Sequence, residues 1–130
     1  MSRTEDVLED EKLVWLATSR PDGRPHLTPI WHRFVGGRFW MCTTENSVKA
    51  RNLRANPSCS VAWGTIAQPA VAEGVARVHD RRQGTFPAAV VAAFAHAFDW
   101  DIDNDDEGYN QLIEIEVRKW LYGPPSSGAG

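Results

Sequence analysis

The chain has 130 residues, of which 42% are hydrophobic and 24% charged, and its net charge is −3. This length fits one domain with one core, and the acidic balance argues against a nucleic-acid partner, which requires a basic surface. No apolar run approaches the roughly 18–20 residues of a membrane span, and the polar, acidic start at 1–12 is unlike a signal peptide. Cys42 and Cys59 lie inside apolar runs, where a free cysteine packs as a small hydrophobic residue, so we expect free thiols and a cytoplasmic protein. Because no apolar run is long enough to span a bilayer, we expect no membrane partner.

Six segments have the length and polarity pattern of strands, at 13–19, 26–35, 38–43, 58–63, 70–79 and 111–120. The first is a continuous apolar run, which predicts a strand covered on both faces. Gly36-Gly37 predicts a tight hairpin between the second and third strands. Gly74 predicts a bulge or a close approach of two backbones. Short strands joined in this way favour a small, closed or nearly closed antiparallel barrel.

Helical patterns occur at three places, one at the start of the chain and two between strands. A helical turn is predicted at 7–12, a short helix at 47–55, and a longer amphipathic helix at 87–98, where aromatic and aliphatic residues recur every four positions. Thr85 is the predicted N-cap of the longer helix. Residues 126–130 are predicted to be a loose tail.

The junction of the third strand with the short helix carries the most chemical information. Thr43, Thr44 and Ser47 supply hydroxyl groups there, and Lys49 supplies a positive charge in the first helical turn. Helix N-termini bind anions through free N–H groups and the helix dipole, so the pattern suggests a site for the phosphate of a cofactor. The alternative is that Ser47 only caps the helix and Lys49 is solvated, and the spacing alone leaves both open.

Other motifs give little support to metal or nucleophilic chemistry. The acidic residues of 103–114 match several positions of a calcium-binding loop, but the alternation at 111–120 predicts a strand where that motif needs a helix. The four histidines lack the spacing of zinc ligands, so no metal site is expected. No nucleophile elbow or nucleotide-binding glycine motif occurs either.

The chain has six tryptophans, and most of them are expected to pack in the core. Trp31 and Trp63 lie near strand ends beside the predicted groove. Either indole could lie against a flat cofactor ring.

Four motifs in the same order resemble those of a known family. They are LATSRPDGRPH at 16–26, TPIW at 28–31, KARNL at 49–53 followed by Asn56-Pro57, and AEGVA at 72–76. Together they resemble the pyridoxamine 5′-phosphate oxidase-like split β-barrel superfamily. Within it, the chain is most similar to the actinobacterial flavin and deazaflavin oxidoreductases that use coenzyme F-420. The resemblance extends over 13–124.

The resemblance implies a mainly β fold, a six-stranded antiparallel split β-barrel with short flanking helices, over a single domain at 1–125. It also implies a homodimer with two cofactor sites at the subunit interface. The phosphate would lie near the strand–helix junction, the ring along 28–31, and the partner subunit would contribute 63–68. The cofactor-binding residues expected on this basis are Thr28, Pro29, Ile30, Trp31, Thr43, Thr44, Ser47, Val48, Lys49, Trp63 and Gln68.

One departure from the family pattern bears on the cofactor. In the vitamin B6 oxidases that this family resemblance brings in, a Ser-Arg-Lys pattern stands where this chain has Ser47-Val48-Lys49. By this comparison, the chain lacks one phosphate-binding arginine. Pyridoxamine phosphate oxidation is therefore not expected. The phosphate of F-420 is a diester with a single charge, which one lysine and the helix N–H groups could balance. FMN, whose phosphate is a dianion, stays open as the alternative cofactor.

The function expected from these residues is hydride transfer from reduced F-420 to a small electron-poor substrate. The cofactor carries this chemistry, so the absence of a recognisable catalytic residue in the sequence is no obstacle. His32 or a water molecule would protonate the product. A non-catalytic carrier of flavin, deazaflavin or haem is the alternative from another class.

Overall fold

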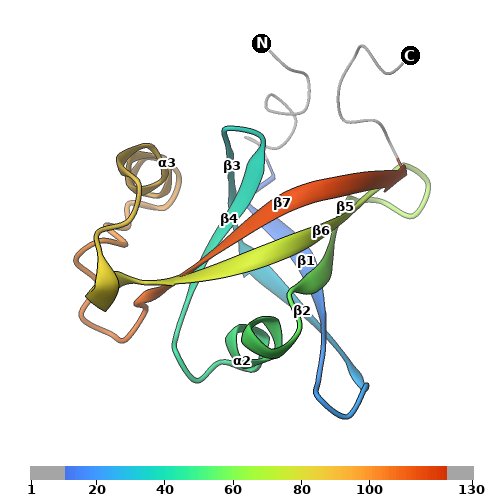
Figure 1. Cartoon of the computed structure of the whole chain (residues 1–130). Helices are drawn as coiled ribbons and strands as arrows, with labels where there is room; N and C mark the ends of the chain where they lie inside the picture. The colour runs from blue at the N-terminus through green and yellow to red at the C-terminus, as the bar shows by residue number, and fades with distance from the viewer. Residues whose placement is uncertain (1–10, 123–130) are drawn as a thin grey trace.

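A computed structural model describes residues 11–122 (Figure 1). Its elements in chain order are β1 (Leu13–Ser19), β2 (Pro25–Trp31), β3 (Arg33–Val35), β4 (Arg38–Thr43), α2 (Val48–Ala55), β5 (Ser58–Gly64), β6 (Pro69–Asp80), the 3-10 turn η1 (Arg81–Gln83), α3 (Ala88–Phe98) and β7 (Gln111–Tyr122). The predicted tail at 126–130 lies outside the described residues. Residues 7–10 of the predicted helical turn at 7–12 lie outside them too.

The strands form one antiparallel sheet of seven strands in the order β2-β1-β5-β6-β7-β4-β3. Consecutive strands β2 and β3 lie at opposite ends of this order, so the sheet must curl to bring its ends together. Figure 1 shows β6 and β7 crossing in front of β1 and β2, as this curling requires. The fold is therefore mainly β, and the curled sheet is consistent with the expected split barrel.

The predicted count of six strands is wrong, because residues 26–35 form two strands instead of one. The chain changes its pairing partner at His32, from β1 to β4. The backbone N–H of His32 donates to the carbonyl of Lys12 at 3.0 Å, outside both ladders. The alternation of residues continues across this break, so the sequence pattern gave no sign of it.

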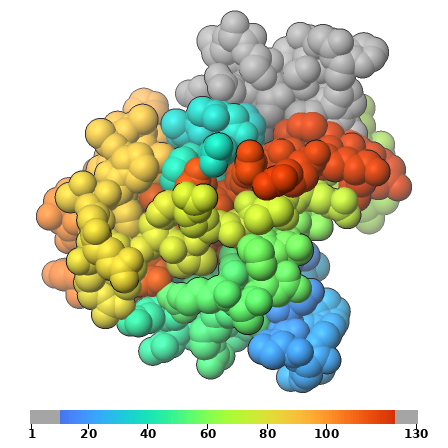
Figure 2. Space-filling view, in the orientation of Figure 1, coloured from blue at the N-terminus to red at the C-terminus, as the bar shows by residue number. Residues whose placement is uncertain are grey.

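Two apolar clusters pack on opposite faces of the sheet. Inside the barrel lie inward residues of β1, β4, β5, β6 and β7, among them Leu16, Phe39 and Ile113. Outside it, α3 packs over the outer face of β4 and β7, and Phe94 and Leu112 are both fully buried there. Figure 2 shows α3 and the chain after it as a lobe at one side of the molecule. This second core attaches α3 to the sheet.

β1 is covered on one face only, contrary to the prediction. Val14 and Leu16 point into the barrel, whereas Leu13 and Trp15 are 51% and 49% exposed. On the neighbouring strand, Leu27 and Trp31 are 62% and 47% exposed. Outward apolar side chains on two paired strands thus form one surface, which we call the β1–β2 face. The continuous apolar run predicted burial, but nothing within residues 11–122 covers this side of it.

Several local predictions are confirmed. Gly36 and Gly37 have φ values of 62° and 77°, the left-handed conformation that a two-residue hairpin needs. The register of β6 against β7 shifts at Gly74, and a Cβ atom there would lie 2.6 Å from the carbonyl oxygen of Glu116. Cys42 and Cys59 are free and buried. Thr85, however, is not the cap of α3, because Pro87 takes that position without a side-chain hydrogen bond.

Candidate functional site

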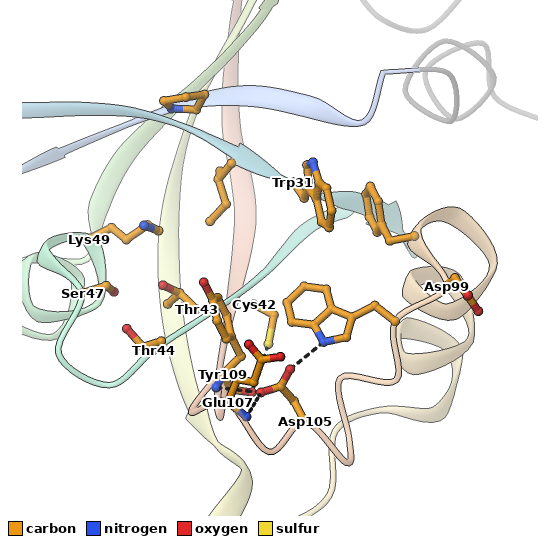
Figure 3. A pocket seen from close by; sticks show the side chains of 14 residues that line it. Trp31, Cys42, Thr43, Thr44, Ser47, Lys49, Asp99, Asp105, Glu107 and Tyr109 are labelled. Atoms are coloured by element: carbon orange, nitrogen blue, oxygen red, sulfur yellow. Dashed lines mark hydrogen bonds between the residues drawn. The ribbon is translucent and has the colours of Figure 1, made fainter.

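A groove of about 610 Å³ opens between β2, the start of α2 and the segment after α3 (Figure 3). Its lining residues are Pro29, Ile30 and Trp31 from β2, Cys42, Thr43 and Thr44 at the end of β4, Ser47 and Lys49 at the start of α2, and Phe98, Asp99, Trp100, Asp105, Glu107 and Tyr109 from α3 and the segment that follows it. Three parts of the chain that are distant in sequence therefore meet here.

The N-terminus of α2 forms the side of the groove that carries the hydroxyl group of Ser47. Ser47 is the N-cap, and its Oγ accepts a hydrogen bond from the N–H of Ala50 at 3.2 Å. A serine oxygen that accepts one bond still has its own proton to donate, so capping and ligand binding are compatible. Arg54 donates to the carbonyl of Glu45 at 3.0 Å and thereby holds the turn that leads into the helix.

Lys49 lies in the first turn of α2, and its ammonium group points into the groove (Figure 3). Burial lowers the pKa of Lys49 from its usual value. No ion-pair partner for this side chain occurs among residues 11–122. A partly buried cation without a counter-charge is unfavourable unless an anion binds beside it. The arrangement favours the anion-binding interpretation over a solvated lysine.

The opposite wall of the groove is aromatic. The indole of Trp31 is stacked on Phe98, with centroids 4.5 Å apart and planes at 3°. Trp100 meets Trp31 edge-on at 6.2 Å and Tyr109 edge-on at 5.4 Å. The guanidinium of Arg33 lies over the Phe98 ring, 5.4 Å from its centroid. Such a wall suits a flat, apolar ring.

Asp105 organises the segment that carries part of this wall. Its carboxylate accepts hydrogen bonds from Trp100 Nε1 at 2.8 Å and from the N–H groups of Glu107 at 2.8 Å and Tyr109 at 3.1 Å. Burial acts to raise the pKa of Asp105, but these hydrogen bonds outweigh it and the pKa is lowered. Asp105 is therefore a charged acceptor that fixes Trp100 and the chain after it.

The structure brings most of the predicted site residues together. Seven of them line the groove, namely Pro29, Ile30, Trp31, Thr43, Thr44, Ser47 and Lys49. Four do not, namely Thr28, Val48, Trp63 and Gln68. Trp63 is 7% exposed and packs edge-on against Trp120 in the barrel core, so its ring is not free for a ligand of its own chain. Gln68 lies in the loop between β5 and β6, where its N–H bonds to Thr65 Oγ1. A contribution of the 63–68 segment to a partner subunit's site stays a prediction.

His32 does not fit the role of proton donor. It is fully buried between β2 and β3 and does not line the groove. Burial lowers the pKa of His32 to about 4, so the imidazole is neutral near pH 7. Its Nδ1 lies 3.3 Å from the carbonyl oxygen of Lys12. His32 is thus a structural residue at the strand break.

Sequence reasoning missed the contribution of the chain after α3. The four-residue periodicity places Phe98 only on an amphipathic helix, and the acidic residues of 99–107 predict a solvated loop. The calcium motif is not assembled, because Glu114 lies in β7 and bonds to Arg38 and His79. Among residues 11–122 no group of three or more acidic, histidine or cysteine side chains is arranged to hold a metal. Only the aromatic content of this segment, Trp100 and Tyr109, hinted at a groove wall.

Comparison with known proteins identifies the family. The family model described as pyridoxamine 5′-phosphate oxidase matches residues 2–122. The chain belongs to this family. Among proteins with curated descriptions, none matches the sequence.

Solved structures of this family's fold resemble the chain over most of its length. The haem storage protein HutZ from Vibrio cholerae is 18% identical, with a TM-score of 0.75 over 94% of this chain and 95% of that one. An F-420 reductase is 21% identical, with a TM-score of 0.69 over 89% and 94%. A conserved hypothetical protein from Mycobacterium tuberculosis is 28% identical, with a TM-score of 0.67 over 89% and 79%. At 18% and 21% identity, the likeness to the first two shows a shared fold.

No helix within residues 11–122 is both long and apolar enough to cross a bilayer.

Proposed function

We propose that the protein is an oxidoreductase that binds coenzyme F-420 at a homodimer interface and transfers a hydride to a small electron-poor substrate. The observation that carries this proposal is the ammonium group of Lys49, which is partly buried, lacks an ion pair within the described chain and points into a groove with an aromatic wall. The likeness in fold to an F-420 reductase supports the same cofactor class.

The groove fits a phosphate-bearing ring compound in size and chemistry. Its volume of about 610 Å³ lies within the usual range of small-molecule sites. At the α2 end of the groove, one cation, the Ser47 hydroxyl and the N-terminal N–H groups suit a single negative charge, which is the charge of a phosphodiester. The other charged groups of the lining are the carboxylates of Asp99, Asp105 and Glu107, which add no positive charge. Val48 adds no second cation. This charge balance favours F-420 over FMN, which is the alternative cofactor of the same site.

The β1–β2 face supports the homodimer. Pro29 and Trp31 belong both to the outward side of β2 and to the lining of the groove. A second copy packed on this face would bury Trp15 and Leu27 and also close the open side of the groove. Exclusion of water from the groove is what hydride transfer requires.

In this proposal each part of the chain has a limited task. F-420, when bound, supplies the hydride from its ring carbon. Lys49 and Ser47 bind the phosphate, and the stacked pair of Trp31 and Phe98 gives the ring a rigid apolar surface. Orientation by such contacts is the protein's part in cofactor chemistry. With His32 neutral and away from the groove, we assign the product's proton to water.

A non-catalytic carrier is the second candidate, because neither cofactor-borne hydride transfer nor cofactor storage requires a catalytic side chain. HutZ, a haem storage protein, has the same fold. No histidine lines the groove, however, and histidine is a common axial ligand of haem. We therefore rank a carrier of flavin or deazaflavin above a haem carrier.

Cofactor titration tests the proposal. Purified protein is titrated with F-420, FMN and haemin by calorimetry, and we expect F-420 to bind most tightly. Failure of both F-420 and FMN to bind more tightly than about millimolar would contradict the proposal. Oxidation of reduced F-420 that occurs only after a candidate substrate is added separates an enzyme from a carrier.

A further inference from the structure

Arg81 connects the end of β6 to the segment between α3 and β7. Its Nη1 donates to the carbonyl oxygen of Ile102 at 2.7 Å and to that of Tyr109 at 3.4 Å. Its Nη2 donates to the carbonyl oxygen of Asp105 at 2.8 Å. The backbone N–H of Arg81 donates to the carbonyl of Asn110 at 2.9 Å. One residue therefore holds four backbone carbonyls of a single segment.

The segment that Arg81 holds, residues 99–110, contains no helix or strand. It nevertheless supplies Trp100, Asp105, Glu107 and Tyr109 to the groove. Asp105 cross-links it internally, but these bonds join the segment only to itself. The side chain of Ile102, which is fully buried in the core under α3, is its main apolar anchor. Arg81 thus gives the segment polar attachment to the barrel.

The opposite end of the groove does not depend on Arg81. Ser47 and Lys49 lie on α2, which is capped by Ser47 itself. The same helix is tied to β1 by the bond from Asn52 Nδ2 to Thr18 Oγ1 at 3.0 Å. The hydrogen bonds of the Arg81 guanidinium run to residues 102–109 and not to α2. Anion binding and ring binding in the groove therefore have separate structural supports.

We propose that Arg81 is a positioning residue of the groove: it fixes Trp100 and Tyr109 through the backbone and so sets the affinity for the ring of the ligand, but not for its phosphate. This inference rests on the proposed function, because it takes the groove as the cofactor site. The planar guanidinium is suited to the task, since its N–H groups diverge in fixed directions toward several carbonyls. A lysine at this position has one nitrogen and cannot reach the same spread of acceptors.

The test compares Arg81→Gln with Arg77→Gln, a matched control at an exposed arginine on β6. Two affinities are measured for each variant: that of F-420 by fluorescence titration, and that of inorganic phosphate by competition with F-420. We expect Arg81→Gln to weaken F-420 binding about tenfold or more and to leave phosphate affinity within about twofold of wild type. Arg81→Lys should restore little of the loss, and Arg77→Gln should change neither affinity.

Three results would overturn the proposal: unchanged F-420 affinity in Arg81→Gln, an equal loss of affinity for F-420 and phosphate, or full rescue by Arg81→Lys. If the wild-type protein binds neither F-420 nor FMN, the proposed function itself fails. Hydrogen exchange of the amides of 100–110 then tests Arg81 independently of any ligand. Faster exchange in Arg81→Gln than in Arg77→Gln supports the positioning role, and equal protection refutes it.

Discussion

Trp31 and Phe98 lie face to face, with their ring centroids 4.5 Å apart and their planes within 3° of parallel. The first is on β2 and the second is the last residue of α3, so this contact joins an end strand of the sheet to the helix outside it. Trp31 is nevertheless 47% exposed. Phe98 therefore fixes one side of the indole and leaves another side open to the groove or to a partner subunit.

The stacked pair should contribute measurably to stability. We expect the double-mutant cycle of Trp31→Ala and Phe98→Ala to give a coupling energy of about 0.5–1.5 kcal/mol, the usual value for an aromatic pair. Urea unfolding of the four proteins measures it. Trp15→Ala is the matched control, because Trp15 is 49% exposed and makes no ring contact with any residue of 11–122. A cycle between Trp15→Ala and Phe98→Ala should give no coupling, and a coupling near zero for Trp31 with Phe98 would contradict the prediction.

Replacement of Lys49 by Met should change affinity and stability in opposite directions. Loss of a charged hydrogen-bond donor to the cofactor phosphate should weaken binding by about 1.5–3 kcal/mol. The pKa of Lys49 is lowered by burial, so folding disfavours its charged form. The ligand-free variant should therefore be at least as stable as wild type at pH 7, and this difference should shrink as the pH rises toward the unfolded-state pKa of lysine.

Calorimetric titration and urea unfolding of the same Lys49→Met preparation check both parts. Lys119→Met, at an exposed position of β7, serves as the control and should change neither quantity. Unchanged cofactor affinity in Lys49→Met would mean that this ammonium group does not contact the phosphate.

Local signals in the sequence were reliable where the physical cause was itself local. The hairpin at Gly36-Gly37 depends on the conformational freedom of two residues, and the cap at Ser47 on its spacing from Ala50. Both could be predicted because each interaction joins neighbours in the chain. The same holds for Lys49, whose position in the first helical turn follows from the position of the cap.

The errors arose from pairings between distant segments. Whether residues 26–35 form one strand or two depends on which strands they pair with, and the alternating pattern is the same in both cases. Trp63 and Trp31 look alike in sequence, but Trp63 shares the inward side of β5 with Val61, whereas Trp31 points outward from β2. The approach of the segment after α3 to Lys49 depends on the core under α3 and on Arg81. Apart from the aromatic residues Trp100 and Tyr109, no pattern within residues 99–110 carries that information.

Acid should destabilise the protein through His32. The pKa of His32 in the folded state is about 4 because the ring is buried, against 6.5 for an ordinary histidine. A depressed histidine pKa means that the native state favours the neutral ring. The stabilisation that the neutral His32 ring gives the folded protein is therefore fully present above pH 6.5. As the pH falls toward 4, the free energy of unfolding decreases by up to about 3 kcal/mol.

Urea unfolding between pH 7 and pH 4 measures this loss. His32→Gln, which cannot titrate, should lose less stability over this range than wild type does. His96→Gln, at an exposed position of α3, should follow the wild-type curve. Identical slopes for His32→Gln and wild type would show that His32 is not the group responsible.

Disruption of the β1–β2 face should separate the proposed homodimer and weaken cofactor binding together. Leu27 is 62% exposed on β2, on the side of the strand that faces away from the core, so Leu27→Asp should leave the folded subunit intact while placing a charge in the interface. We expect wild type to have the mass of a dimer in light scattering after size exclusion, and Leu27→Asp that of a monomer with at least about tenfold weaker F-420 binding. Ala92→Asp, on the exposed side of α3, is the control and should remain dimeric. A wild-type protein that is monomeric at micromolar concentration, or a monomeric Leu27→Asp variant with full affinity for F-420, would show that a second subunit does not complete the groove.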